Sequence, residues 1–156
     1  MSDYTVEQLN TFIVKAKAAT YVGSGQHAPS HRLGSIDLEF RADPFAYLDS
    51  YFGGTDFIGQ EVVYYAARPV WAMNYYGYIL RPDVIDAAQA GKVIQLSLSR
   101  LYAEGRFLGG FEHPVDGYTY TDTNSGDAAH FQGKEWITCR GIRAYAFVYH
   151  GGLIKS

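Results

Sequence analysis

The sequence predicts an α+β fold: a tandem duplication of a helix-strand-strand-strand unit that gives a mostly antiparallel six-stranded sheet with two helical regions on one face. Two observations favour it. Segments with apolar residues at helical spacing precede segments in which apolar and polar residues alternate. The second half of the chain also repeats positions of the first. We therefore expect a single domain over residues 1–156, with repeats at approximately 5–80 and 82–154.

The first half is expected to begin with a helix. Thr5 and Gln8 form a capping box in front of a predicted helix from Thr5 to Ala19. A long Gly- and Ser-rich loop is predicted from Thr20 to Ser35, and loops of that length are functional or mobile. The predicted strands that follow are Asp37 to Phe40 as a short edge strand, Phe45 to Tyr51, Gln60 to Tyr65 and Val70 to Tyr78.

The second half follows the same plan. Pro82 suits a first helical turn, so the second helical region is expected to open at Arg81, to break or bend at Gly91 and to stop by Gly105. The segment FLGGFEHPVD is predicted to be a loop. Three strands are then expected, at Tyr118 to Asp122, Lys134 to Cys139 and Ala144 to Tyr149.

An internal repeat appears when Phe131 is placed under Phe57. The matching motifs are Phe57-x-Gly59-x-Glu61 with Phe131-x-Gly133-x-Glu135, Tyr75-x-Gly77 with Tyr149-x-Gly151, and, one residue out of step, Phe45 to Ser50 with Tyr118 to Thr123. Two amphipathic hairpins can share such positions by chance, but we favour duplication as the explanation of the repeat.

Both hairpins are predicted to have four-residue loops, Ala66 to Pro69 and Arg140 to Arg143. The alternation of side chains then gives a small and aliphatic face, which we expect the helices to cover, and an aromatic face left open. The aromatic face would comprise Tyr64, Trp71, Met73, Tyr75, Trp136, Tyr145, Phe147 and Tyr149. The alternative is that the faces are reversed and these rings form the core.

An uncovered aromatic face of this size suggests a binding surface. The candidate ligand-binding residues are Glu61, Tyr64, Trp71, Asn74, Tyr75, Tyr76, Glu135, Trp136 and His150. Glu61 and Glu135 occupy equivalent positions, so they could form an acid/base pair or a cation site. Structural hydrogen bonding is the simpler interpretation of both glutamates.

The composition argues against other functions. A net charge of −3 gives no basic stripe, so no direct nucleic-acid partner is expected, and no apolar run approaches the roughly 20 residues that span a membrane. The start of the chain lacks a secretory signal, which predicts a cytoplasmic location. The histidines lack metal-ligand spacing and the glycines lack a nucleotide motif, so we expect no metal and no cofactor. Cys139 is interpreted as a packing residue.

The stretches SHRLGSIDLEF, DSYFGGTDFIGQEVVYY, PVWAMNYYGYI and YHGGLI resemble an uncharacterised bacterial family, a domain of unknown function that occurs alone or after an XRE-type helix-turn-helix DNA-binding domain. No activity comes with this resemblance. The predicted first helix begins almost at the initiator, so no DNA-binding segment is expected in this chain. The fused members imply that the domain senses a molecule.

Three functions remain open from the sequence. The first is a sensor-like module that binds a small molecule or peptide between the two hairpins. The second is an enzyme, a hydrolase or isomerase that uses Glu61 and Glu135. The third is a protein-interaction domain that forms a homodimer through the aromatic face.

Overall fold

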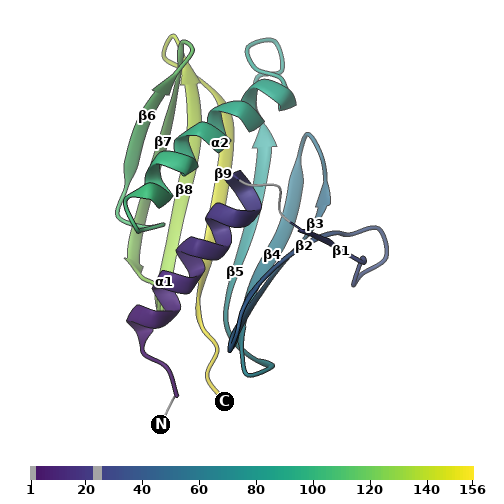
Figure 1. Cartoon of the computed structure of the whole chain (residues 1–156). Helices are drawn as coiled ribbons and strands as arrows, with labels where there is room; N and C mark the ends of the chain where they lie inside the picture. Colours follow the sequence, from purple (N-terminus) through teal and green to yellow (C-terminus); the bar gives the residue numbers. More distant parts are fainter. Residues whose placement is uncertain (1–2, 23–25) are drawn as a thin grey trace.

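The computed structural model describes residues 3–22 and 26–156, which form two helices and nine strands (Figure 1). The helical elements are α1 (Val6–Lys17), a π-helical turn η1 (Ala18–Val22) and α2 (Ala87–Ala103). The strands are β1 (Gln26–Ala28), β2 (Ile36–Ala42), β3 (Phe45–Gly53), β4 (Phe57–Tyr65), β5 (Arg68–Ile79), β6 (Phe111–Val115), β7 (Tyr118–Asp127), β8 (His130–Cys139) and β9 (Ile142–Leu153).

The nine described strands form one antiparallel sheet in the order β1-β2-β3-β4-β5-β9-β8-β7-β6. The two halves of the chain meet at the centre, where β5 pairs with β9 from Trp71–Leu153 to Ile79–Tyr145. Both helices lie on the same face of this sheet (Figure 1). The helix layer therefore covers one face of the central strands and leaves the other face uncovered.

The expected count of six strands is too low. β1 lies inside the predicted loop from Thr20 to Ser35, of which residues 23–25 are outside the described part of the chain, and β2 is longer than expected. β6 lies inside the segment predicted as the second loop. It contains Pro114, which a sheet accepts at β6 because that strand is at the edge.

Both helices begin at capping boxes. The Gln8 N–H donates to Thr5 Oγ1 (3.1 Å) and the Thr5 N–H donates to Gln8 Oε1 (2.8 Å), as the sequence predicts. The start expected for the second helix at Arg81 is wrong, because α2 is capped by Asp86 and begins at Ala87. The expected break at Gly91 is also wrong, since this glycine lies within α2 with open space around it.

Both predicted hairpin loops are two residues too long. Ala66 and Ala67 form a two-residue turn with φ of 47° and 64°, so Tyr65 pairs with Arg68. A bulge between Val63 and Tyr64 then shifts the register by one residue, so that Val63 pairs with Trp71 and Glu61 pairs with Met73. The second hairpin has the same design, with a turn at Arg140 and Gly141 and a register shift between Ile137 and Thr138. The two shifts fall at residues that the alignment of Phe57 with Phe131 makes equivalent.

The predicted assignment of the faces is wrong in consequence. Trp71, Tyr75 and Tyr145 lie beneath the helices, with at most 4% of their surface exposed. Tyr64 and Trp136 lie on the opposite, open face, because alternation along β4 and β8 places them next to the buried residues Val63 and Ile137. The physical reason for the error is that large rings, rather than small side chains, fill the space between two helices and a wide sheet.

Candidate functional site

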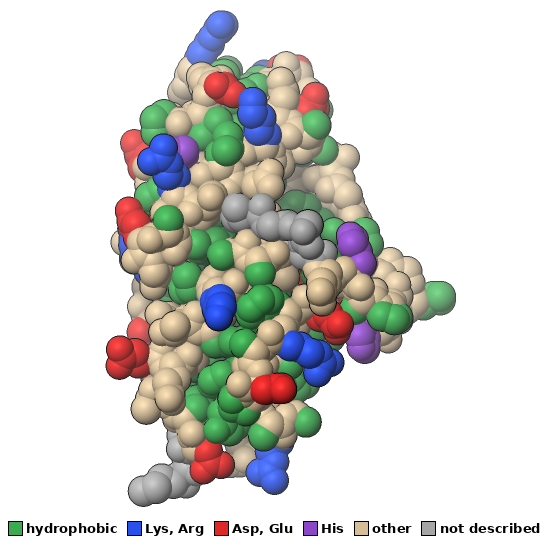
Figure 2. All heavy atoms as spheres, viewed as in Figure 1, with side chains coloured by type: hydrophobic (Ala, Val, Ile, Leu, Met, Phe, Trp, Pro, Cys, Tyr) green, Lys and Arg blue, Asp and Glu red, His purple; other side chains and the backbone are tan. Residues whose placement is uncertain are grey.

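Four carboxyl side chains lie in the interior between the helices and the sheet. The four residues are Asp49 on β3, Glu61 on β4, Asp122 on β7 and Glu135 on β8, and none is more than 8% exposed. On the outside of the helix-bearing face, charged side chains are scattered among hydrophobic ones (Figure 2). A buried carboxyl group is costly unless it is hydrogen-bonded or paired with a cation, so the partners of these four groups define the site.

Tyrosine hydroxyl groups supply the partners in the first half of the chain. Tyr47 Oη donates to Glu61 Oε1 at 2.5 Å, and Tyr75 Oη donates to Asp49 Oδ1 at 2.6 Å. All four side chains are buried. The two bonds connect β3, β4 and β5 beneath the helices.

The second half repeats this arrangement. Tyr120 Oη donates to Glu135 Oε1, and Tyr149 Oη donates to Asp122 Oδ1 at 2.7 Å. Asn124 adds a bond from its Nδ2 to Tyr149 Oη at 3.1 Å. Each half therefore contributes one glutamate and one aspartate, each hydrogen-bonded by a tyrosine.

The repeated glycines make room for two of these tyrosines. Gly59 pairs with Tyr75 and Gly133 pairs with Tyr149 in neighbouring strands. A Cβ atom at either glycine would collide with the ring or hydroxyl group of the paired tyrosine. The glycine in the Phe-x-Gly-x-Glu motif thus allows the tyrosine ring to cross the strand and reach the aspartate beyond it.

We expect Gly133→Ala to destabilise the fold by about 1–3 kcal/mol, because the new methyl group displaces the buried Tyr149 ring. Gly91→Ala is the matched control, since its Cβ meets open space on α2 and should stabilise the helix by about 0.5–1 kcal/mol. Urea denaturation of both variants measures the difference. If Gly133→Ala were as stable as the parent protein, the Tyr149 ring could not lie across β8 at Gly133 as described.

Lys17 is the cation of this interior. Its Nζ lies 2.8 Å from Glu61 Oε1 and 3.0 Å from Oε2, and the lysine side chain is 4% exposed. Three aromatic rings surround the ammonium group, with centroids 5.3 Å away at Phe107 and 6.0 Å away at Trp71 and Tyr21. The last turn of α1 thereby holds an ammonium group between a carboxylate and aromatic faces.

A cavity of about 50 Å³ lies beside Lys17, between the helices and the sheet. Its lining residues are Lys17, Tyr21, Phe57, Glu61, Met73, Ile94, Leu98, Tyr102, Phe107, Glu135, Tyr145, Phe147 and Tyr149. Glu61 and Glu135 both face it, from strands separated by β5 and β9. Three inter-strand spacings separate their backbones by about 14 Å. Within the described residues the two carboxyl groups do not hydrogen-bond each other.

Burial is the main influence on the pKa of Asp49 and of Glu135. It raises the pKa of Asp49 to about 8, and the nearby charge of Glu61 adds to the shift. It also raises the pKa of Glu135 to about 8, with Asp122 adding to that shift. Since these pKa values lie above those of an unfolded chain, the folded protein binds more protons between about pH 4 and 8. The resulting stabilisation is fully present below about pH 4 and is lost progressively as the pH rises to about 8.

The sheet divides the candidate residues from the sequence into two groups. Glu61, Trp71, Tyr75 and Glu135 lie on the face beneath the helices. On the open face, Asn74, Tyr76 and His150 line a shallow depression, and the Arg143 guanidinium lies 4.2 Å from the ring centroid of Trp136. Tyr64 is also on that face. The nine residues therefore do not form one site, and the buried rings are not available as a dimerisation surface.

Several residues of the interior were not among the site residues predicted from the sequence. The alignment of Phe45 to Ser50 with Tyr118 to Thr123 already contained the pairs Tyr47 with Tyr120 and Asp49 with Asp122. Lys17 continues the buried stripe of Leu9 and Ile13 at intervals of four residues, which is a signal for a buried lysine. Its partner Glu61 is 44 residues away, and no local pattern connects them.

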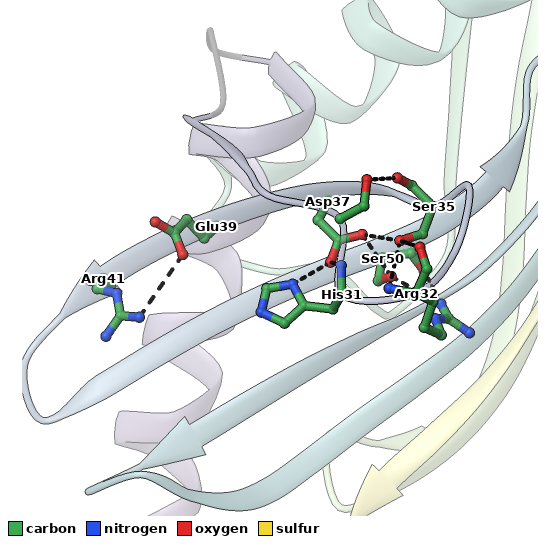
Figure 3. Close-up of polar contacts among 8 residues, drawn as sticks. His31, Arg32, Ser35, Asp37, Glu39, Arg41 and Ser50 are labelled. Carbon is green, nitrogen blue, oxygen red and sulfur yellow. Dashed lines mark hydrogen bonds and ion pairs between the residues drawn. The ribbon is translucent and has the colours of Figure 1, made fainter.

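A second polar cluster anchors the segment before β2 (Figure 3). The buried Asp37 accepts hydrogen bonds from Ser35 Oγ (2.7 Å), Ser50 Oγ (2.9 Å) and the backbone N–H of His31 (3.1 Å), and lies 2.6 Å from His31 Nδ1. Burial raises the pKa of Asp37, but these hydrogen bonds outweigh it and hold the pKa below its ordinary value. Arg32 ties the same segment to the backbone oxygen of Ser50 at 2.9 Å. These contacts fix the loop on β2 through Asp37 and on β3 through Ser50.

The described residues contain neither a cluster suited to a metal ion nor a helix suited to crossing a membrane. No group of three or more His, Cys, Asp or Glu side chains has the geometry to hold a metal ion. Neither α1 nor α2 combines the length and apolar character that would let a helix cross a membrane.

A match to a known protein family shows which family the chain belongs to. A model of a domain of unknown function, DUF5680, matches residues 49–154, which is more than half of the sequence. The chain belongs to the DUF5680 family. The matched part of this DUF5680 domain contains three of the four buried tyrosine–carboxyl pairs in full, and it begins at Asp49 itself. Comparisons with curated proteins and with solved structures gave no match.

Proposed function

We propose that this DUF5680 domain is a module that binds a small molecule in the cavity between its helices and its sheet. The observation that carries the proposal is the combination of aromatic walls with a few buried polar groups around one cavity, which is typical of ligand sites. Lys17, Glu61 and Glu135 are the amino and carboxyl groups of its lining. The proposal replaces the site expected from the sequence on an open aromatic face.

The size of the cavity limits the ligand. At about 50 Å³ it is far smaller than the roughly 300–1,000 Å³ of sites that enclose a drug-sized molecule. It has room for about three or four water-sized groups. We therefore propose a small ligand, or a larger one that inserts only a small terminal group, rather than a peptide lying in an extended groove.

We further propose that the chain is a single domain, that its two halves derive from a duplication and that it acts as a sensor in the bacterial cytoplasm. The repeated tyrosine–carboxyl pairs and the equivalent bulges support the duplication. The resemblance to a family fused with helix-turn-helix domains supports the sensor role.

We expect Ile94→Phe to weaken ligand binding at least about tenfold, because the larger side chain from α2 fills the cavity. Leu96→Phe is the matched control, since Leu96 is two residues away on the same helix and 44% exposed. Ligand-observed NMR titrations with n-butylammonium, n-butanol and butyrate measure binding. If none of the three probes binds the parent protein, or if Ile94→Phe binds every probe as well as Leu96→Phe does, the cavity is not a ligand site.

A further inference from the structure

The two halves of the interior differ in one respect that bears on the ligand. Lys17 lies twelve residues after the N-cap Thr5, and the residue twelve positions after the N-cap Asp86 of α2 is Leu98. Tyr21 and Tyr102 are related in the same way, and both line the cavity. The helices thus repeat the same positions around the cavity, but only α1 supplies a cation there.

Glu135 consequently lacks the partner that Glu61 has. Among the described residues, Tyr120 provides the only hydrogen bond to the Glu135 side chain, and no lysine, arginine or histidine lies within ion-pair distance of it. A carboxylate accepts more than one hydrogen bond, so Glu135 keeps unused acceptor capacity. It is 8% exposed and faces the cavity, where water cannot solvate it freely.

The walls beside Glu135 resemble the surroundings of the Lys17 ammonium group. Phe147 and Tyr149 line the same cavity, with ring centroids 5.9 Å apart, and Tyr145 completes that side. Aromatic faces next to a carboxyl group favour a positively charged group. Lys17 with Glu61 therefore shows, within the same molecule, how this fold holds an ammonium ion.

We propose that the cavity binds a protonated alkylamine whose ammonium group pairs with Glu135, in the place that corresponds to the lysine ammonium beside Glu61. This inference rests on the proposed function and specifies the class of ligand. The volume of about 50 Å³ admits the ammonium group and a few carbon atoms, so a longer amine would enter by its charged end. Leu98 supplies apolar contact where a second lysine would otherwise block the site.

Ion pairing would also couple binding to pH. Without ligand, burial holds the pKa of Glu135 at about 8, whereas a bound ammonium group favours the carboxylate and lowers that pKa. Affinity should therefore rise with pH up to about 8 and fall only when the amine itself loses its proton. The other titratable groups that influence Glu135, or are influenced by it, are Lys17 on α1, Tyr102 on α2, Glu61 on β4, Tyr120 and Asp122 on β7, and Tyr145 and Tyr149 on β9.

The test compares n-butylammonium, n-butanol and butyrate on the parent protein, on Glu135→Gln and on the control Glu112→Gln, whose side chain is exposed on β6. We expect the parent and the control to bind n-butylammonium about ten- to a hundredfold more tightly than n-butanol, as for hydrogen bonds to a charged group. Glu135→Gln should lose that preference and its pH dependence while still binding n-butanol. Leu98→Lys should fold and exclude n-butylammonium, because the new ammonium group occupies the site.

The possible outcomes separate this inference from the proposed function. If n-butanol or butyrate binds the cavity as tightly as n-butylammonium, the cavity is a ligand site and the cation inference is wrong. An unchanged affinity of Glu135→Gln for n-butylammonium would overturn it as well. Loss of binding of all probes in Glu135→Gln would be checked by the thermal unfolding of that variant. If the variant remains folded, Glu135 shapes the cavity rather than selecting the charge, and the inference fails.

Discussion

Lys17→Met should lower the free energy of unfolding by about 3–5 kcal/mol. Methionine still fills the interior with a long, unbranched side chain. The substitution removes the only cation that lies within ion-pair distance of Glu61 among the described residues. Glu61 is fully buried and would be left as an uncompensated charge, which is the costly way to break a buried ion pair. Urea denaturation at neutral pH measures the loss.

Two further variants distinguish the ion pair from a general effect on the helix. Lys15→Met changes the same residue type on the exposed side of α1 and should alter stability by less than about 0.5 kcal/mol. Adding Glu61→Gln to Lys17→Met should recover much of the loss, since the amide oxygen still accepts the hydrogen bond of Tyr47. If the double variant is no more stable than Lys17→Met, the cost arises from lost packing and not from the unpaired carboxylate.

Trp71→Ala should destabilise the domain by about 3–5 kcal/mol, because the indole is completely buried at the centre of the core. Its ring stacks on Phe131 at a centroid distance of 5.7 Å and meets Phe107 edge-on at 5.9 Å. Its Nε1–H donates to the backbone oxygen of Ala128 at 2.9 Å, so the substitution also leaves a buried acceptor without a donor.

The other tryptophan is the matched control for this prediction. Trp136 is half-buried on the open face, where the Arg143 guanidinium covers its ring. Trp136→Ala should cost no more than about 1.5 kcal/mol, because solvent replaces the lost contact without leaving a cavity. Thermal and urea unfolding of both variants give the comparison. A larger loss for Trp136→Ala than for Trp71→Ala would contradict the placement of the core beneath the helices.

Sequence patterns predicted the helices and most strands but not their register. The capping box at Thr5 located α1, and apolar alternation located β4, β5, β8 and β9. The hairpin turns were missed because Ala66 and Ala67 adopt positive φ, which is normally a signal of glycine or asparagine. An error in register of one residue moves every later side chain to the other face. The bulge between Val63 and Tyr64, rather than the turn itself, shifts the register by one residue and places Glu61 on the face of the rings, while Asn74 stays on the opposite face.

The candidate site was predictable only in part for a different reason. Glu61 and Glu135 stood out because the repeat aligns them, and both do face the cavity. To predict that α1 places Lys17 and α2 places Leu98 beside the cavity, one needs the position of each helix over the sheet. That position depends on packing between distant segments. Asn74 and Tyr76 were grouped with Glu61 because the predicted register pairs Glu61 with Asn74, and His150 was added because the repeat makes it equivalent to Tyr76. In the structure Glu61 pairs with Met73, so Asn74 and Tyr76 point to the opposite face.

The central position of β9 has a consequence for synthesis of the protein. β5 pairs on one side with β4 and on the other with β9, although 62 residues of chain lie between Ile79 and Ile142. Until β9 leaves the ribosome, β5 is therefore an unpaired edge, and the aromatic rings beneath the helices have incomplete neighbours. β9 is the last strand in chain order, yet it completes the middle of the sheet. The two halves of the chain therefore become stable together rather than one after the other.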